Sequence, residues 1–344
     1  MKVLIVNNMA PFVWGGAEEL AVHLQKQIEV FGYQSEILRL PFQWEPAKTI
    51  ISQMLYVRGL ELTNVDRVIA LKFPAYLIRH PHKTLWLLHQ YRQAYDLYDV
   101  GETNLVREEG QNLKQVIHQA DNQAFAEAQK IFVNSTVTQR RLKHYNGFDS
   151  QVLLPPLNDI ERFSGGEYGD YIFAGGRVNS MKRQHLLVEA LSEADPRVRL
   201  VIAGPPDKES DRIQLENLVS QYGLTDRVKL DLRFLPREDY AAYVNGARCV
   251  AYLPYDEDSL GYVTMEAATA KKAILTTSDS GGILGLAKDG ATGWITEPNA
   301  IDLAKAMSTV FQDRAQAESF GNNAKAKWEE FDVNWESTVK ALVS

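Results

Sequence analysis

The chain of 344 residues contains only one cysteine, Cys249. A single cysteine excludes a disulfide framework within the chain, and it excludes a zinc site built from several thiolates. Cys249 lies in the apolar run Ala-Arg-Cys-Val-Ala-Tyr-Leu. We therefore expect it to pack in the core as a small hydrophobic residue rather than to react.

Long apolar runs are also absent. No stretch approaches the roughly 18 consecutive apolar residues that are typical of a membrane-spanning helix. The opening MKVLIVNN is too short for the apolar core of a signal peptide. The sequence thus predicts a cytoplasmic protein without a spanning segment, and it leaves open a weak peripheral association with the inner face of the membrane.

Positive charge is not in excess, because 37 Lys and Arg residues face 44 Asp and Glu residues, for a formal net charge of -7. Residues 1–165 carry 17 basic and 17 acidic residues, so the surplus of acids lies in the rest of the chain. A nucleic-acid surface needs a dense basic stripe. We expect no nucleic-acid partner, and any bound anion must be held by a local site.

What the sequence does contain is an alternation of short apolar runs with amphipathic helical patterns, which predicts parallel sheets with flanking helices. In the first half the expected strands are 2–6, 35–40, 67–71, 84–88 and 130–134, with a long helical stretch at 102–128. In the second half they are 171–176, 198–204, 227–232, 249–254, 273–277 and 293–297. With 45% hydrophobic residues, a chain of this length can form two cores.

A break between the two series is marked by Pro155, Pro156 and the glycines that follow them. We place the first domain at 1–160 and the second at 168–327. The last helical pattern, 301–342, is interrupted around 331–335, so that a C-terminal helix within 328–344 can cross back and complete the first domain. The expected fold class is α/β, with two Rossmann-like doubly wound domains facing a central cleft. Ligands bind such sheets beyond the carboxyl ends of the strands.

Three features of the first domain each allow two interpretations, one as part of a binding site and one as ordinary structure. Gly15 and Gly16 fall at a helix start, which favours an anion through its backbone N–H groups and dipole, or they form a plain turn. His89 follows a buried-looking run and either bonds a sugar hydroxyl or is structural. The region 42–60, with Trp44 and Tyr56, is expected to pack as core, although it could instead face a lipid-linked sugar.

The second domain places two cations directly after its first strand. Arg177 and Lys182 share the loop Gly-Gly-Arg-Val-Asn-Ser-Met-Lys-Arg. At a strand end they can flank a diphosphate, the guanidinium by forked contacts and the ammonium as a point charge. A salt-bridged surface pair is the alternative reading.

The stretch DEDSLGYVTME, residues 256–266, joins a strand to a helix that we expect to begin near Gly261. The backbone of Tyr262, Val263 and Thr264, in the first turn of this helix, offers donors to a phosphate. One turn further, the carboxylate of Glu266 can accept from both hydroxyls of a ribose diol.

The remaining acids of this stretch have different expected roles. Asp258, on the loop, could accept a hydrogen bond from a hexose hydroxyl. For Asp256 and Glu257 we favour a solvated loop that caps the helix.

Together these residues resemble the GT-B glycosyltransferases, and specifically the retaining glycosyltransferase family 4, also called glycosyltransferase group 1. The resemblance covers nearly the whole chain. It is carried by Gly15-Gly16-Ala17-Glu18, His89, Pro155-Pro156, Gly176-Arg177 with Lys182, Gly204, and the segment from Asp258 to Glu266.

The segment from 258 to 266 also departs from the family pattern, in which two glutamates have seven residues between them. Glu266 matches the second glutamate, whereas Asp258 occupies the first position and is one methylene shorter. Leu260 replaces the usual phenylalanine. Earlier in the chain, Arg183 stands where a glycine usually follows the lysine.

The resemblance implies transfer of a hexose from a nucleotide sugar with retention of anomeric configuration. Arg177, Lys182, Asp258 and Glu266 would then serve the reaction, and no metal or other cofactor would be required. UDP-glucose is the expected donor and GDP-mannose the alternative. The acceptor would be a saccharide or a lipid-linked saccharide in polysaccharide or glycoconjugate biosynthesis.

The nucleotide base would lie, by position, near Arg233 and Phe234, which follow the strand at 227–232. Two rival classes remain. One is a metal-dependent GT-A transferase in which Asp256 and Asp258 hold the ion, and it predicts one mixed sheet. The other is a non-catalytic protein that binds a sugar nucleotide or a polysaccharide.

Overall fold

The computed structural model describes the backbone of residues 1–344 and the side chains of all of them except residues 107 and 108. The chain forms two compact units. The first consists of Met1–Pro156 and Val333–Ser344, and the second of Leu157–Asp332. The first change of unit thus falls directly after the two prolines.

The first unit is built on a parallel six-stranded sheet of order β2-β1-β3-β4-β5-β6. All five strands expected from the apolar runs are present. The sixth was missed because it contributes only two residues, too few for a periodic signal. The strands are β1 (Lys2–Met9), β2 (Gln34–Pro41), β3 (Arg67–Ala70), β4 (Lys83–Leu87), β5 (Lys130–Val133) and β6 (Gln151–Val152).

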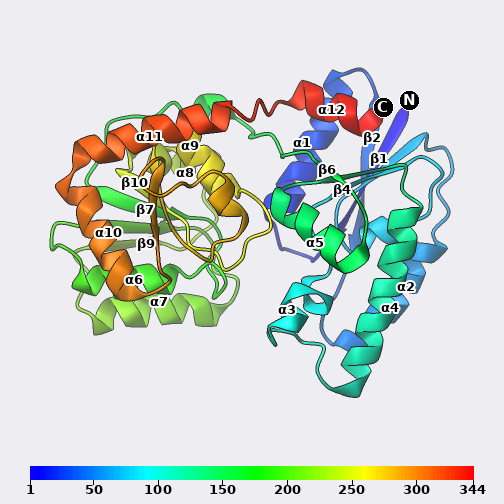
Figure 1. The fold of residues 1–344 in the computed structure, drawn as a ribbon, viewed down its shortest axis with the longest axis horizontal. Helices are drawn as coiled ribbons and strands as arrows, with labels where there is room; N and C mark the ends of the chain where they lie inside the picture. The colour runs from blue at the N-terminus through cyan, green and yellow to red at the C-terminus, as the bar shows by residue number, and fades with distance from the viewer. The chain divides into compact units, whose positions relative to one another are not determined.

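The helices of the first unit connect these strands and cover the sheet. They are α1 (Gly16–Val30), α2 (Ile50–Gly59), α3 (Asp96–Asp99), α4 (Arg107–Ala126), α5 (Thr136–Asn146) and, from the end of the chain, α12 (Trp335–Val343). Helix α12 contacts α1 and β4, and Val339 and Leu342 are buried in one cluster with Leu24 and Trp86. The expected return of the C-terminal helix to the first domain is confirmed (Figure 1).

The region 42–60 corrects the sequence-based expectation in part. Ile50, Met54 and Val57 are buried, as a core segment requires. Trp44 and Tyr56, in contrast, are 47% and 62% exposed. The core prediction is therefore wrong for the two aromatic residues, because they lie on the outer side of a segment whose aliphatic residues fill the core.

The second unit contains a parallel six-stranded sheet of order β12-β11-β10-β7-β8-β9. Its strands are β7 (Tyr171–Gly175), β8 (Arg199–Ala203), β9 (Val228–Asp231), β10 (Cys249–Ala251), β11 (Ala273–Thr277) and β12 (Gly293–Thr296). Cys249 is buried in this core, as expected. Two parallel sheets confirm the α/β prediction and contradict the single mixed sheet of the GT-A hypothesis.

The helices of the second unit are α6 (Gln184–Glu193), α7 (Glu209–Gln221), α8 (Arg237–Gly246), α9 (Tyr262–Thr269), α10 (Ala300–Gln312) and α11 (Arg314–Glu329). The single helix expected from residue 301 onward is wrong, because Asp313 ends α10 and caps α11. Its side chain accepts a hydrogen bond from the N–H of Gln316 at 2.9 Å. Across the described residues, no helix combines the length and apolarity needed to cross a membrane.

A buried polar cluster lies in the core of the first unit. The hydroxyl of Tyr95 donates to the Asp121 carboxylate at 2.7 Å, and Asn146 donates to that hydroxyl at 3.2 Å. Asp121 is fully buried. Burial raises the pKa of its carboxyl to about 7, although the hydrogen bond from Tyr95 opposes this shift.

We expect Asp121→Asn to weaken the pH dependence of stability. Between the unfolded value of 3.8 and the folded value of about 7, the folded protein keeps a proton that the unfolded chain has lost. The stability due to Asp121 therefore falls as pH rises through this window and levels off above it. Thermal unfolding from about pH 5 to pH 8 measures the effect. Asp149→Asn, at a position 90% exposed, is the control, and equal pH slopes for wild type and Asp121→Asn would contradict the prediction.

Candidate functional site

The loops after β7 and β8 approach each other closely at the carboxyl end of the second sheet. The N–H of Gly176 donates to Ala203 O at 3.1 Å, and that of Val178 to Pro205 O at 2.9 Å. A Cβ on Gly204 would stand 2.1 Å from the Gly176 carbonyl oxygen, so only glycine fits there. This backbone contact fixes the loop that carries Arg177 and Lys182.

Arg177 is paired with a carboxylate from the neighbouring loop. Its Nη1 lies 3.1 and 3.2 Å from the two carboxylate oxygens of Asp207. Asn179 ties the loop together, since its amide donates to Asp207 at 2.8 Å and its oxygen accepts the N–H of Lys182 at 2.9 Å. The Arg177 side chain is 41% exposed, so solvent screens this ion pair and it can exchange partners at low cost.

Lys182 has a more enclosed environment. Its Nζ donates to the hydroxyl of Tyr252 at 2.7 Å and pairs with the carboxylate of Glu257. Burial alone would lower the pKa of Lys182, but Glu257 and Tyr252 outweigh it and hold the pKa above its ordinary value. Lys182 therefore remains an ammonium. The expectation that Glu257 is a solvated loop residue is wrong, since its side chain is only 20% exposed and holds Lys182.

Helix α9 begins where the sequence predicted. Gly261 is its N-cap and has a φ of 72°, a left-handed value that favours glycine. A Cβ there would also stand 2.8 Å from the ring of Tyr252. The N–H of Thr264 donates to Gly261 O at 3.1 Å, so this amide is used within the turn. The amides of Tyr262 and Val263 lie earlier in the turn, where a helix has no internal acceptor for them.

The start of α9 is adjacent to the cationic loop. A Cβ on Gly176 would stand 3.6 Å from Cγ2 of Val263, and Tyr252 contacts both Lys182 and the position of Gly261. The fold thus places Lys182 and the loop that carries Arg177 beside the amino end of a helix. Fixed donors and positive charge at one sheet edge form a site suited to a phosphate group.

Glu266 is enclosed by residues that sequence reasoning missed. Its side chain is 3% exposed, and Oε1 lies 2.6 Å from Nη1 of Arg237. Burial raises the pKa of Glu266, while Arg237 and Tyr240 act against this shift. Arg237 lies at the start of α8, far from Glu266 along the chain, and no motif spacing could have indicated the pair. Whether Glu266 binds a ribose stays a prediction.

Asp258 is 7% exposed, and its loop is fixed by the loop after β11. The N–H of Glu257 donates to Ser280 O at 3.3 Å, and the N–H of Gly282 donates back to Glu257 O at 2.7 Å. Gly281 has a φ of 65°, and a Cβ there would stand 2.5 Å from Glu257 N. The glycines at 281 and 282 thus allow the two loops to pair through their backbones.

Arg183 stands where the family resemblance leads us to expect a glycine, and its contacts show what the arginine does there. It has a φ of 53°, a left-handed conformation in which glycine would be unstrained. Its guanidinium binds Leu253 O at 2.7 Å, Pro254 O at 3.1 Å and the Asp279 carboxylate at 2.7 and 2.8 Å. It also reaches the hydroxyl of Thr277 at 2.8 Å. Arg183 therefore links the loops after β7, β10 and β11.

We expect Arg183→Ala to lower the free energy of unfolding by about 2 kcal/mol or more, because it leaves Asp279 without its cation and keeps the left-handed backbone. Arg183→Gly loses the same bonds but relieves about 1 kcal/mol of backbone strain. The glycine variant should thus fall between alanine and wild type in urea unfolding. An alanine variant as stable as wild type would show that the guanidinium contributes nothing.

Arg233 and Phe234 follow β9 at the same edge of the sheet. Arg233 is held by Asp231 at 2.7 Å and by Asp239 at 3.3 Å, and its side chain is 58% exposed. Phe234 is 66% exposed. An exposed aromatic ring at a strand end can stack on a base, so the predicted role of this loop stays open.

The predicted residues of the first unit lie at the start of α1 and after β4, and groups of the protein itself already bind them. The N–H of Gly15 donates to Oε2 of Glu18 at 3.0 Å, and Oε1 of Glu18 pairs with Lys72 at 3.0 Å. The start of α1 at Gly16 thus already has a carboxylate beside it. His89 follows β4, and its Nδ1 lies 2.6 Å from Gln90 O.

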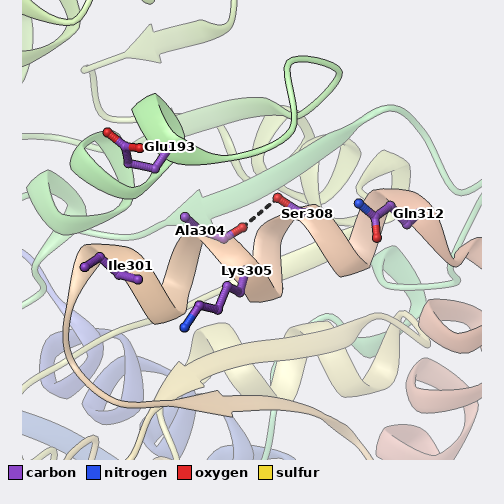
Figure 2. A pocket seen from close by; sticks show the side chains of 6 residues that line it. All are labelled: Glu193, Ile301, Ala304, Lys305, Ser308 and Gln312. Atoms are coloured by element: carbon purple, nitrogen blue, oxygen red, sulfur yellow. Dashed lines mark hydrogen bonds between the residues drawn. The ribbon is translucent and has the colours of Figure 1, made fainter.

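A surface pocket in the second unit lies between α6 and α10, and Figure 2 shows the side chains that line it. They are Glu193, Ile301, Ala304, Lys305, Ser308 and Gln312, and none of them is a predicted site residue. Ser308 donates to the carbonyl of Ala304 at 2.7 Å. Among the residues described, no group of three or more His, Cys, Asp or Glu side chains is arranged to hold a metal ion.

The two units together have the fold of the GT-B glycosyltransferases. Residues 159–327, which make up nearly all of the second unit, match the family model described as Glycosyl transferases group 1. No curated protein sequence matches the chain.

Solved structures resemble the chain over its full length. HepE from Anabaena, in complex with UDP and glucose, has a TM-score of 0.74 and 18% identity, covering 99% of this chain and 98% of that one. Sucrose-phosphate synthase from Thermosynechococcus elongatus has a TM-score of 0.76 and 17% identity, covering 99% and 96%. WaaG, a glycosyltransferase involved in lipopolysaccharide biosynthesis, has a TM-score of 0.73 and 15% identity, covering 100% of both chains. At these identities the likeness concerns the fold.

Proposed function

We propose that the protein is a retaining hexosyltransferase that transfers glucose from UDP-glucose to a saccharide or lipid-linked saccharide. The observation that carries the proposal is that the loop with Arg177 and Lys182 lies beside the amino end of α9 at one sheet edge. This edge lies in the unit that matches the group 1 family. A helix start and two cations suit the diphosphate of a nucleotide sugar.

In the proposed reaction, the bond between the anomeric carbon and the diphosphate breaks, and the acceptor oxygen forms the new bond from the same face. Arg177 and Lys182 neutralise the departing diphosphate, and the amides of Tyr262 and Val263 donate to it. The departing phosphate takes the proton of the acceptor hydroxyl. No side-chain nucleophile is part of this proposal.

The remaining predicted residues position the substrate. Asp258 would accept from a hexose hydroxyl, and Glu266 would accept from the ribose while sharing Arg237. Arg233 and Phe234 would lie beside the base.

The choice of donor is supported by the structural neighbours. HepE was solved with UDP-glucose as well as with UDP, and WaaG is involved in lipopolysaccharide biosynthesis. GDP-mannose is the second candidate for the donor. A lipid-linked acceptor would lie in the membrane. The protein would then be cytoplasmic and would associate weakly with the inner face of the membrane.

The first test is release of nucleoside diphosphate from a panel of UDP-, GDP- and ADP-sugars. We expect slow hydrolysis of UDP-glucose, and Lys182→Ala should lower it at least tenfold, which corresponds to about 1.4 kcal/mol of transition-state stabilisation. Lys305→Ala, a lysine 72% exposed in the same unit, is the matched control. Unchanged hydrolysis by folded Lys182→Ala would remove Lys182 from the site, and release from no donor would favour a non-catalytic binding protein.

A second expectation is that the transfer needs no divalent metal, because cationic side chains and a helix terminus supply the charge that stabilises the leaving group. Turnover should be the same within twofold, roughly, with excess EDTA as with added Mg²⁺ or Mn²⁺. Loss of activity in EDTA with recovery on adding either metal would overturn this expectation.

A further inference from the structure

We infer that Glu257 is an internal counter-ion that competes with the diphosphate for Lys182 and so limits how tightly the nucleoside diphosphate is held. This inference rests on the proposed function. Glu257, which the sequence predicted to be a solvated loop residue, thereby has a role in the site. That role affects how tightly the product binds and not the bond-making step.

The geometry is a closed triangle of three side chains. Lys182 Nζ donates to Tyr252 Oη at 2.7 Å and pairs with Oε2 of Glu257. The Tyr252 hydroxyl lies 3.3 Å from the same Oε2. An ammonium has three N–H donors, so two are engaged and one remains for a phosphate oxygen.

The charges of this triangle cancel. A diphosphate that approaches Lys182 meets a neutral pair instead of a free cation. The Arg177–Asp207 pair is also neutral, but its side chains are 41% and 30% exposed, so it exchanges partners easily. Lys182 and Glu257 are each 20% exposed beside a Tyr252 that is 8% exposed, so their attraction is less screened and a ligand must compete with it.

The backbone of Glu257 is held on both sides, so the residue stays beside Lys182 when a ligand arrives, and the hydroxyl of Tyr252 lies 3.3 Å from its carboxylate. Its N–H binds Ser280 O at 3.3 Å, and its carbonyl accepts from Gly282 N at 2.7 Å. The carboxylate therefore stays within reach of Lys182, and the diphosphate must share the ammonium with it.

Replacing Glu257 with a neutral residue should remove the competition for Lys182 and favour the diphosphate. In Glu257→Gln, Lys182 keeps its charge but lacks an anion until the ligand supplies one. We expect the ligand-free variant to unfold at a lower temperature than wild type. We also expect it to bind UDP and inorganic pyrophosphate at least about fivefold more tightly, the lower end of typical coupling between sites.

The experiment is isothermal titration of UDP and of pyrophosphate into wild type, Glu257→Gln, Lys182→Met and the double variant. Because competition requires the ammonium, the gain from Glu257→Gln should vanish in the Lys182→Met background. Glu318→Gln, which removes an equal charge from a pair on α11, should leave both affinities unchanged.

Each outcome decides the question. Equal or weaker binding by Glu257→Gln overturns the inference and leaves the proposed function intact, as a purely structural role would lower stability without tightening binding. A gain of the same size in the Lys182→Met background overturns it too, because Glu257 would then act by plain repulsion. If wild type binds neither ligand, the proposed function fails and the inference with it. Should Glu257→Gln not fold, Glu257→Asp, which withdraws the carboxylate by one methylene, is expected to tighten binding by a smaller factor, and unchanged affinity would overturn the inference.

Discussion

The candidate site depends on one guanidinium, that of Arg183. It binds carbonyls after β10, a hydroxyl at the last residue of β11 and a carboxylate after β11, and it belongs itself to the loop after β7. A left-handed residue at this point carries a conformational cost. The cost persists because the side chain satisfies several acceptors at once. The positions of Lys182 and Glu257 follow from this arrangement, since both belong to loops that Arg183 joins.

Much of the fold follows from the order of residues along the chain. Parallel strands buried on both faces are continuous apolar runs, and glycines or prolines mark their ends. For this reason nearly every strand and the start of α9 at Gly261 could be predicted. The predictions that were wrong also have physical causes. Strand β6 is too short to have a period, Asp313 divides one helical pattern by capping, and Trp44 faces outward from a segment whose neighbours are core.

The site could be predicted only in part. Sequence motifs located Arg177, Lys182 and Gly261 at strand and helix ends, and the structure brings these elements together. Side-chain partners were beyond prediction, because Glu257 with Lys182 and Arg237 with Glu266 are pairs between loops far apart along the chain. Such pairs decide whether a charge faces a ligand or another residue, and no spacing rule encodes them.

Helix α12 makes the first unit discontinuous along the chain. Residues that cover Leu24 and Trp86 are synthesised only after the entire second unit. Until then, part of the apolar surface of the first unit lacks its cover, so the first unit cannot complete its packing before α12 has been synthesised. The second unit has no such dependence, because its segment is continuous from Leu157 to Asp332. The order of synthesis and the order of final packing therefore differ for the two halves of this protein.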